Sequence, residues 1–178
     1  MKALGIDPGT ATTGYGILEG EADSLKVIDY GCIKTSSRET AHSRLAKINK
    51  DLKKLISKHK PNCIVVEKLF FGKNARTAMS VGQARGVILL AASQAGVEIA
   101  EYTPLEVKMA LTGYGRADKN QIQQMVKRLL KLKTLPKPDD AADALAVALC
   151  HINSDGFNSK VSHAYRQARP GGQAGKAS

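Results

Sequence analysis

The pattern of hydrophobic and polar positions changes period several times along the chain, and each change marks a predicted element. Short apolar runs over 2–6, 13–20 and 25–34 are separated by turn residues, which predicts three strands in an antiparallel meander. Residues 41–60 then repeat apolar positions at intervals of three and four. This spacing is typical of an amphipathic helix, here with a lysine-rich outer face.

The second half of the pattern predicts strands alternating with helices. Segment 62–71 contains four consecutive apolar residues rich in β-branching, which favours a strand buried on both faces. Residues 76–96 predict a helix whose second half, GVILLAA, is apolar nearly all round, so one side faces the sheet and another is available for a second subunit. The remaining predictions are a strand at 97–104, a glycine-containing loop at 111–116, and helices at 118–133 and 138–153.

This order of elements predicts an α/β fold, a five-stranded mixed sheet with helices on both faces. We expect one domain over residues 1–155, because no internal repeat or linker divides it. Residues 156–178 are rich in Gly, Ser, Lys and Arg, and we expect them to form a basic, disordered tail.

The charge balance points to a polyanionic partner. Among 178 residues, 27 are Lys or Arg and 16 are Asp or Glu, which gives a net charge of +11. Such a protein gains affinity for nucleic acid by releasing counterions from phosphates. The charge does not indicate what the protein does to that partner.

The cysteines and the N-terminus exclude several protein classes. Cys32, Cys63 and Cys150 are widely spaced and odd in number, which argues against a disulfide framework and against a cysteine zinc site. The apolar run near the N-terminus is too short for a signal peptide, and no segment is long enough to predict a membrane span. We therefore expect a cytoplasmic protein.

Acidic residues occupy the ends of two predicted strands. Asp7 ends the strand in ALGIDPGT, and Glu67 ends CIVVE. If the two strands are parallel neighbours, both carboxylates lie at one sheet edge, where ligand sites of open α/β sheets form. The alternatives are a simple Asp-Pro-Gly turn for Asp7 and a solvent-exposed position for Glu67.

A second acidic group opens the last predicted helix. Asp139, Asp140 and Asp143 fall within five residues, and their spacing places Asp143 on the same helix face as one of the other two. For Asp139 the alternative is a favourable interaction with the helix dipole. Grouped carboxylates repel one another, and a hard cation such as Mg²⁺ or Mn²⁺ removes that penalty. In a basic protein, this combination predicts metal-assisted phosphodiester hydrolysis, to which one or two ions per subunit can contribute.

Four motifs in order resemble one known family. They are GIDPGTATTGYGI, IVVEKLFFGKNARTAMSVGQARG, TPLEVKMALTGYGRADK and DDAADALAVALCH, and they span roughly residues 1–153. On these motifs the chain is similar to the RuvC-type Holliday junction resolvases, which have a ribonuclease H-like fold.

The resemblance implies roles for individual residues. The family's metal-binding and catalytic tetrad would fall on Asp7, Glu67, Asp140 and Asp143, because the pattern D-A-A-D-A matches from Asp140. Its active-site lysines would match Lys108 in EVK and Lys119 in ADK, where each could stabilise charge on the phosphate.

The loop after Glu67 carries the implied DNA contacts. Phe70 matches the family's phenylalanine that stacks on a junction base, and Lys73 and Arg76 lie in position to contact phosphate. Arg85 falls inside a predicted helix and receives no role.

The resemblance also implies the substrate and partners. We expect a homodimer that uses helix 76–96 as its interface and binds four-way junction DNA. It would nick two strands symmetrically in recombination and repair, leaving 5′ phosphate and 3′ hydroxyl ends. The family further implies the RuvA/RuvB branch-migration complex as a partner.

Three other functions share parts of this pattern. A sugar kinase or actin-type phosphotransferase also begins with a strand and a D-x-G-T turn, but it needs two such domains. A non-catalytic nucleic-acid-binding module would explain the charge and leave the carboxylates unexplained. A ribonuclease H-like enzyme acting on RNA–DNA hybrids would share the order of elements.

Overall fold

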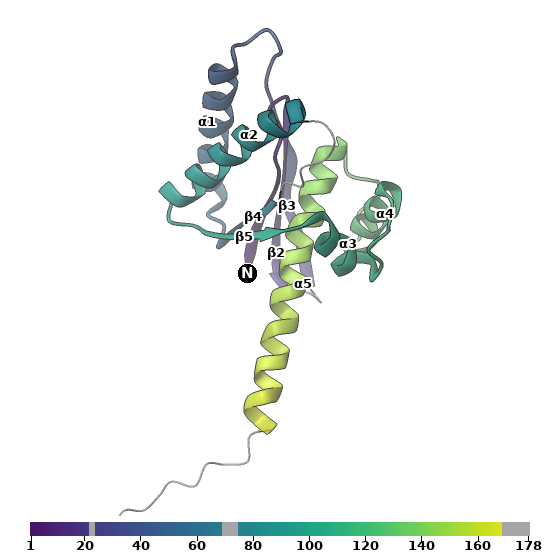
Figure 1. Cartoon of the computed structure of the whole chain (residues 1–178). Coiled ribbons are helices and arrows are strands. Elements are labelled where there is room, and N and C mark those ends of the chain that lie inside the picture. The colour runs from purple at the N-terminus through teal and green to yellow at the C-terminus, as the bar shows by residue number, and fades with distance from the viewer. Residues whose placement is uncertain (22–23, 69–74, 169–178) are drawn as a thin grey trace, which may run out of the picture.

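The computed structural model describes residues 1–21, 24–68 and 75–168 (Figure 1), with side chains described outside 75–77 and 155–168. Its elements in chain order are β1 (Lys2–Asp7), β2 (Thr12–Glu21), β3 (Ser24–Lys34), α1 (Ala41–His59), β4 (Cys63–Glu67), α2 (Ala75–Gln94), β5 (Glu98–Tyr102), α3 (Pro104–Thr112), α4 (Lys119–Leu129) and α5 (Asp139–Ala168).

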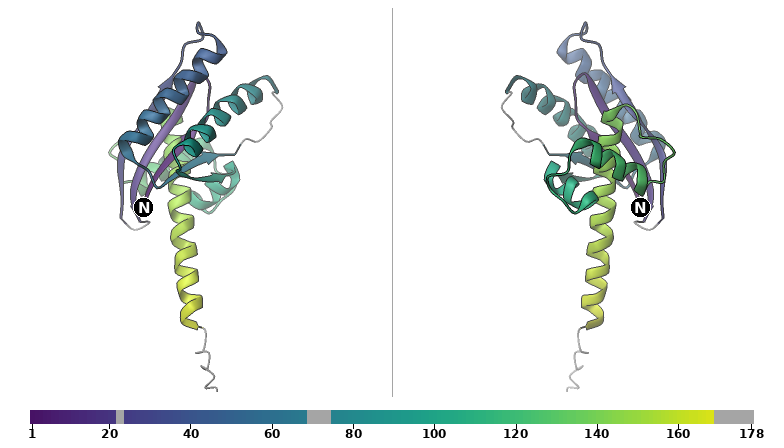
Figure 2. Two further views of the ribbon diagram at one scale, coloured as in Figure 1. Left: turned by 90° about the vertical axis from the view of Figure 1, so that its left-hand side faces the viewer. Right: turned by 90° about the vertical axis from the view of Figure 1, so that its right-hand side faces the viewer.

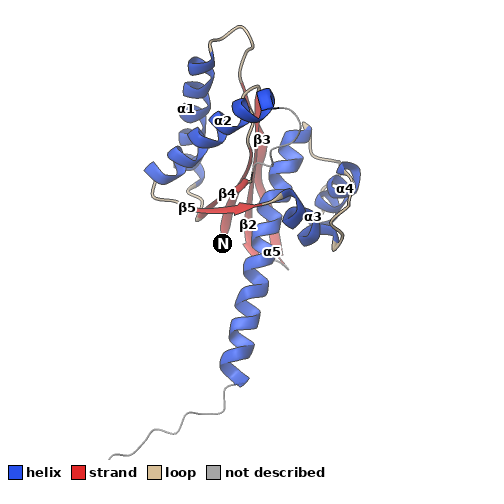
Figure 3. Ribbon diagram, in the orientation of Figure 1, coloured by secondary structure: helices blue, strands red, loops and turns tan. Residues whose placement is uncertain are grey.

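The five strands form one mixed sheet in the order β3-β2-β1-β4-β5 (Figure 3). β1, β2 and β3 pair antiparallel as a meander, whereas β4 runs parallel to both β1 and β5. The predicted α/β class and five-stranded mixed sheet are therefore confirmed, and the first and fourth strands are the parallel neighbours that a shared edge for Asp7 and Glu67 requires. As a result, β1 and β4 end at the same edge of the sheet.

Helices cover both faces of the sheet, and each face has its own aliphatic core. On one face α1 and α2 pack against β-strand residues such as Leu4, Ile6 and Ile64. On the other face α3, α4 and α5 pack against Leu18, Val65 and their neighbours. The alternation follows from the strand period of two, which sends successive side chains of a buried strand into opposite cores.

Helix α5 lies unusually close to β1 and β2 because glycines leave room for its backbone. A Cβ atom at Gly5 would lie 2.1 Å from the Ala144 carbonyl oxygen, and one at Gly14 would lie 1.9 Å from that of Asp140. A Cβ atom at Gly16 would lie 2.7 Å from the side chain of Leu145 and 2.9 Å from its backbone nitrogen. Gly5 is paired with Gly16 in the antiparallel ladder, so the glycines form a flat strip beneath the helix.

The structure corrects several predicted boundaries. Residues 103–112 were not predicted as a helix, yet α3 begins there with Thr103 as N-cap, Pro104 in its first turn and Glu106 completing a capping box. The sequence TPLE is a recognisable helix start, with an N-cap threonine, a first-turn proline and a capping-box glutamate, whereas the apolar pattern of this short helix does not reveal it. The predicted strand 97–104 is therefore too long, and the helix predicted to 133 ends at Leu129.

Helix α5 is longer than predicted. Its predicted end was residue 153, but the helix continues to Ala168 and extends beyond the sheet, as Figure 2 shows from two sides. The segment expected to be a tail thus overlaps this helix up to 168, and residues 169–178 lie outside the described residues. Within the described part of the chain, no helix combines the length and apolar character needed to cross a membrane.

We predict that Gly5→Ala destabilises the fold by about 1–3 kcal/mol or more, because the new methyl group would overlap the α5 backbone. Gly86→Ala is the matched control, since Gly86 lies within α2 and has no atom within 4 Å of the added Cβ. That change should raise stability by about 0.5–1 kcal/mol. Urea unfolding of both variants checks the prediction, and equal stabilities would contradict the close approach.

Candidate metal centre and active site

Four carboxylates gather where β1 and β4 end and α5 begins. Asp7 is the last residue of β1, and Glu67 is the last residue of β4. Asp140 and Asp143 occupy the first turns of α5, which lies against β1 and β2. The close contact at Gly14 brings the backbone of Asp140 directly over β2 beside Asp7, because Asp7 and Gly14 are paired across the two strands.

The electrostatics show that these side chains share one environment. Burial raises the pKa of Asp7 to about 7, and the charges of Glu67, Asp143 and Asp140 contribute in that order. Burial and the charge of Asp143 also raise the pKa of Glu67. The pKa of Asp143 is raised mainly by burial, against the lowering effect of Lys119. Such mutual repulsion requires carboxylates that are close to one another.

The two lysines expected at the site lie beside it. A cavity of about 220 Å³ is lined by Glu67, Asp143, Lys108 and Lys119, with apolar walls that include Val107 and Ile122. Lys108 comes from α3, and Lys119 is the first residue of α4. The cavity therefore joins two carboxylates to two cationic groups from separate helices.

Lys119 connects α4 to both acidic turns of α5. Its Nζ atom lies 3.2 Å from Oδ2 of Asp139 and 3.2 Å from Oδ2 of Asp143. The two aspartates differ in exposure, because the Asp139 side chain is 63% exposed and that of Asp143 is 34% exposed. Asp143 thus faces the enclosed site, while Asp139 lies at its rim.

The loop after Asp7 is held by hydroxyl groups. Thr13 Oγ1 donates a hydrogen bond to the Gly9 carbonyl at 2.6 Å, and Thr35 Oγ1 donates to the Thr10 carbonyl at 2.5 Å. Arg44 Nε of α1 donates in turn to Thr35 Oγ1 at 2.8 Å. The Asp-Pro-Gly segment is therefore a tethered turn, and its tethers fix the position at which Asp7 leaves the sheet.

The donor set suits a hard divalent cation. All four acidic groups offer oxygen ligands only, and burial raises the pKa of three of them, Asp7, Glu67 and Asp143. Among the described residues, no three His, Cys, Asp or Glu side chains are close enough to form a complete metal site.

The structure brings together six of the residues singled out in the sequence, namely Asp7, Glu67, Asp140, Asp143, Lys108 and Lys119. Phe70 and Lys73 lie outside the described residues. Arg76 is in the first turn of α2, but its side chain is outside the described part. Arg85 forms an ion pair with Glu101 of β5.

Two features of the site were missed in the sequence. The glycines of LGID and TGYG alternate along their strands, which is the signal that another backbone approaches closely. Cys32 of β3 also lies beside the carboxylates. Burial raises the pKa of its thiol, and the nearby charges of Asp140, Lys34 and Asp7 act on it as well. No sequence pattern places Cys32 there, because it depends on the pairing of β3 with β2.

Comparison with known proteins gives one consistent result. The family model for "Crossover junction endodeoxyribonuclease RuvC" matches residues 3–151. The protein of that name from Halothermothrix orenii is 55% identical over 160 residues, which cover 90% of this chain and 97% of that protein. A Thermus thermophilus RuvC structure aligns with a TM-score of 0.82 at 36% identity, covering 89% of this chain and 97% of the other. A second structure, of T. thermophilus RuvC in complex with Holliday junction substrate, also gives 0.82 at 33% identity, covering 89% and 98%.

The raised pKa of Asp7 predicts how the metal-free protein responds to pH. Because folding raises this pKa from 3.8 to about 7, the folded state binds an extra proton between these values. The Asp7 carboxylate therefore destabilises the fold above about pH 7, and the penalty disappears as the pH falls toward 4. At pH 8 without metal, Asp7→Asn should raise the free energy of unfolding by about 2–4 kcal/mol, and at pH 4 the gain should be lost.

Calorimetry or urea unfolding at the two pH values measures this difference. Asp139→Asn is the control, because Lys119 lowers the pKa of Asp139 and its removal should not stabilise the protein at pH 8. Adding MgCl₂ should stabilise the wild type at pH 8 more than the Asp7→Asn variant. If the metal-free wild type and the Asp7→Asn variant are equally stable at pH 8, the Asp7 carboxylate does not destabilise the fold and the prediction is wrong.

Proposed function

The chain belongs to the RuvC family of crossover junction endodeoxyribonucleases, and from this premise we propose that Asp7, Glu67, Asp140 and Asp143 are its metal-binding catalytic tetrad. The protein is a hydrolytic nuclease that resolves four-way DNA junctions in recombination and repair. The observation that supports the tetrad is the mutual electrostatic effect of the four carboxylates at one sheet edge.

We propose Mg²⁺ as the metal, with one or two ions per subunit and Mn²⁺ as a substitute. Divalent-metal dependence is general in this family of nucleases, and oxygen-only donors select these ions over zinc. Asp7 and Asp143 would be among its ligands, because both are partly buried and the charge of Asp143 acts on both Asp7 and Glu67. When bound, the metal would supply the positive charge that activates water and stabilises the leaving 3′ oxygen.

The protein's own groups position the phosphate. Lys108 and Lys119 enter the cavity beside Glu67 and Asp143, so a phosphodiester placed there meets two cationic side chains. Lys119 is already oriented by its contacts with Asp139 and Asp143. We expect its ammonium group to contact a phosphate placed in this cavity. The apolar walls of the cavity limit water around the reacting group.

The substrate determines the assembly that we propose. A four-way junction has approximate two-fold symmetry, and a homodimer would present two equivalent sites for paired, symmetric nicks. Each nick would leave a 5′ phosphate and a 3′ hydroxyl. Junction DNA lies in the cytoplasm of bacteria, and we expect the enzyme to act there. The RuvA/RuvB branch-migration complex remains an expected partner.

Helix α2 is the proposed dimer interface. Met79 is 70% exposed and Leu90 is 54% exposed, although both lie on a helix whose opposite side fills the core with Ile88 and Ala91. The helix is therefore apolar on more than one side, as predicted, because it has large hydrophobic side chains at its surface as well as in the core. A second subunit would remove that apolar area from water.

The alternatives lose their basis once the family is known. A binding module would not need the buried carboxylates, and an actin-type phosphotransferase would need a second domain of the same kind. An enzyme specific for RNA–DNA hybrids shares the fold, but the relative solved with a Holliday junction points to four-way DNA.

We predict that Asp143→Asn lowers the single-turnover rate of junction cleavage by about 10³-fold or more while junction binding persists, because it removes a metal ligand. Asp139→Asn is a closely matched control, since Asp139 makes the same 3.2 Å contact with Lys119 from the same helix. That variant should keep most of the rate. Gel shift and cleavage of a synthetic mobile junction in Mg²⁺ measure both quantities, and similar losses in the two variants would refute the assignment.

We predict that Leu90→Asp yields monomers, because a charge would be placed in the proposed α2 interface. Leu129→Asp on α4 is the control, as Leu129 is also exposed, at 39%, and lies outside that interface. Sedimentation velocity of the two variants and the wild type reports the assembly state. A Leu90→Asp variant that remains dimeric would show that the subunits associate through another face.

A further inference from the structure

A basic groove lies between α1 and the edge strand β3, outside the cavity that holds the catalytic groups. We call it the lysine groove; its volume is about 450 Å³, and its lining consists of Tyr15, Cys32, Ile33, Lys34, Lys47, Asp51, Lys54, Leu55 and Lys58. Four lysines and one aspartate give this lining three net positive charges. The proposed cleavage chemistry uses none of these residues.

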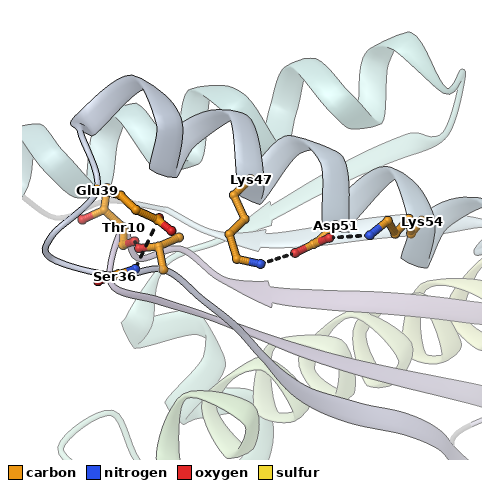
Figure 4. A network of polar contacts seen from close by, with 7 residues as sticks. Thr10, Ser36, Glu39, Lys47, Asp51 and Lys54 are labelled. Carbon is orange, nitrogen blue, oxygen red and sulfur yellow. Dashed lines mark hydrogen bonds and ion pairs between the residues drawn. The ribbon is translucent and has the colours of Figure 1, made fainter.

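The lysines of the groove are partly arranged before any ligand binds. Asp51 Oδ2 lies 2.8 Å from Lys47 Nζ, and Asp51 Oδ1 lies 2.9 Å from Lys54 Nζ. Figure 4 shows the three side chains in a row along the side of α1 that overlies the strands. Lys58 lies one turn beyond Lys54 and is 69% exposed, with a loose contact of 3.7 Å to Asp29. A single carboxylate thus orients two ammonium groups without neutralising the row.

One end of the groove lies near the carboxylate site. Cys32 lines the groove and is paired with Gly14, the residue over which the backbone of Asp140 packs. Lys34 also lines the groove; it is the last residue of β3 and pairs with Thr12, five residues after Asp7. β2 lies between β3 and β1, but the end of β3 is tied to the loop after Asp7, because Thr35 donates hydrogen bonds to the carbonyls of Thr10 and Ala11. A ligand that leaves the carboxylate site across this end of β3 therefore meets Lys34 first and the α1 lysines next.

We infer that the lysine groove binds the sugar-phosphate backbone of a junction arm that leaves the cleavage site over the edge of β3. The inference rests on the proposed function, since it assigns the path of the same substrate. Lys47, Lys54 and Lys58 form a stripe about 16 Å long at 1.5 Å per helical residue. About five nucleotides of one strand span this length at about 3.4 Å each. Lysines bind phosphates as point charges and carry no base information, so this contact is independent of sequence.

The test is a triple variant that keeps the Lys47–Asp51 pair intact, namely Lys34→Gln, Lys54→Gln and Lys58→Gln. Each of these lysines is exposed, so the fold should persist, and circular dichroism with thermal unfolding verifies this. The control triple variant is Lys53→Gln, Lys60→Gln and Lys133→Gln, which removes the same charge from exposed positions outside the groove. Fluorescence anisotropy measures the Kd for a synthetic four-way junction in EDTA across a salt series.

We expect the groove variant to bind the junction about tenfold more weakly at about 0.1 M salt and to lower the slope of log Kd against log salt by about 2–3, near 0.9 per lost phosphate contact. The control variant should change both quantities much less. Equal losses in the two variants would attribute the effect to bulk charge and overturn the inference. A groove variant with the wild-type Kd would also overturn it, and would leave an acidic protein segment as the ligand to test next.

Cleavage separates this inference from the proposed function. With enzyme in large excess and the junction fully bound in Mg²⁺, the groove variant should cut at the wild-type rate, because Lys108, Lys119 and the carboxylates are unchanged. If the wild type itself fails to cut junctions, the proposed function fails whatever the groove variant binds. If the wild type cuts and the groove variant binds as tightly as the control, only the groove assignment fails.

Discussion

The close contact of α5 with the glycine strip of β1 and β2 is the constraint on which the site depends. Asp7 is positioned by a strand, but Asp140 and Asp143 are positioned by a helix that comes from the far end of the fold. They meet because Gly5, Gly14 and Gly16 leave no side chains between the sheet and the helix backbone. Any methyl group on this strip would push the first turns of α5 away from Asp7. The catalytic geometry is thus a consequence of packing between two elements that are distant in the sequence.

The same packing creates an electrostatic cost that a cation relieves. Burial alone raises the pKa of Asp7, and three neighbouring carboxylates add to the effect. Grouping these carboxylates lowers the stability of the fold, because like charges in a low-dielectric region repel strongly. Lys119 offsets part of the repulsion from one side by contacting Asp143. In our proposal the remaining negative charge favours the binding of a divalent metal, which would link stability to the groups assigned to the chemistry.

The basic charge is distributed to complement this acidic centre. Lys108 and Lys119 line the cavity with Glu67 and Asp143, and Lys34 with the α1 lysines lines a separate groove beside β3. On the path that we propose, a polyanion meets positive charge in both places. This distribution lets a protein with a net charge of +11 accept DNA over a cluster of acids that would otherwise repel phosphate. In this proposal, DNA binding along the groove and cleavage at the carboxylates rely on different residues.

The sequence by itself determined the class of fold and the identity of the acidic residues. Periodicity predicted all five strands and four of the five helices, because buried strands and amphipathic helices each leave a pattern of their own. It missed α3, whose nine residues are too few for a clear period, and it ended α5 too early because the polar residues after 153 do not reveal a helix that leaves the core. The motif D-A-A-D-A, with its resemblance to a known family, singled out Asp140 and Asp143.

Only the tertiary structure decided which of these groups interact. It joined Lys108 and Lys119 with Glu67 and Asp143 around one cavity, and it placed Cys32 beside Asp140. These contacts depend on strand order and on the depth at which α5 packs, and neither is a local property of the chain. The pattern of apolar and polar residues indicates which face of an element is buried. The distance between two charged groups depends instead on how all the intervening elements pack.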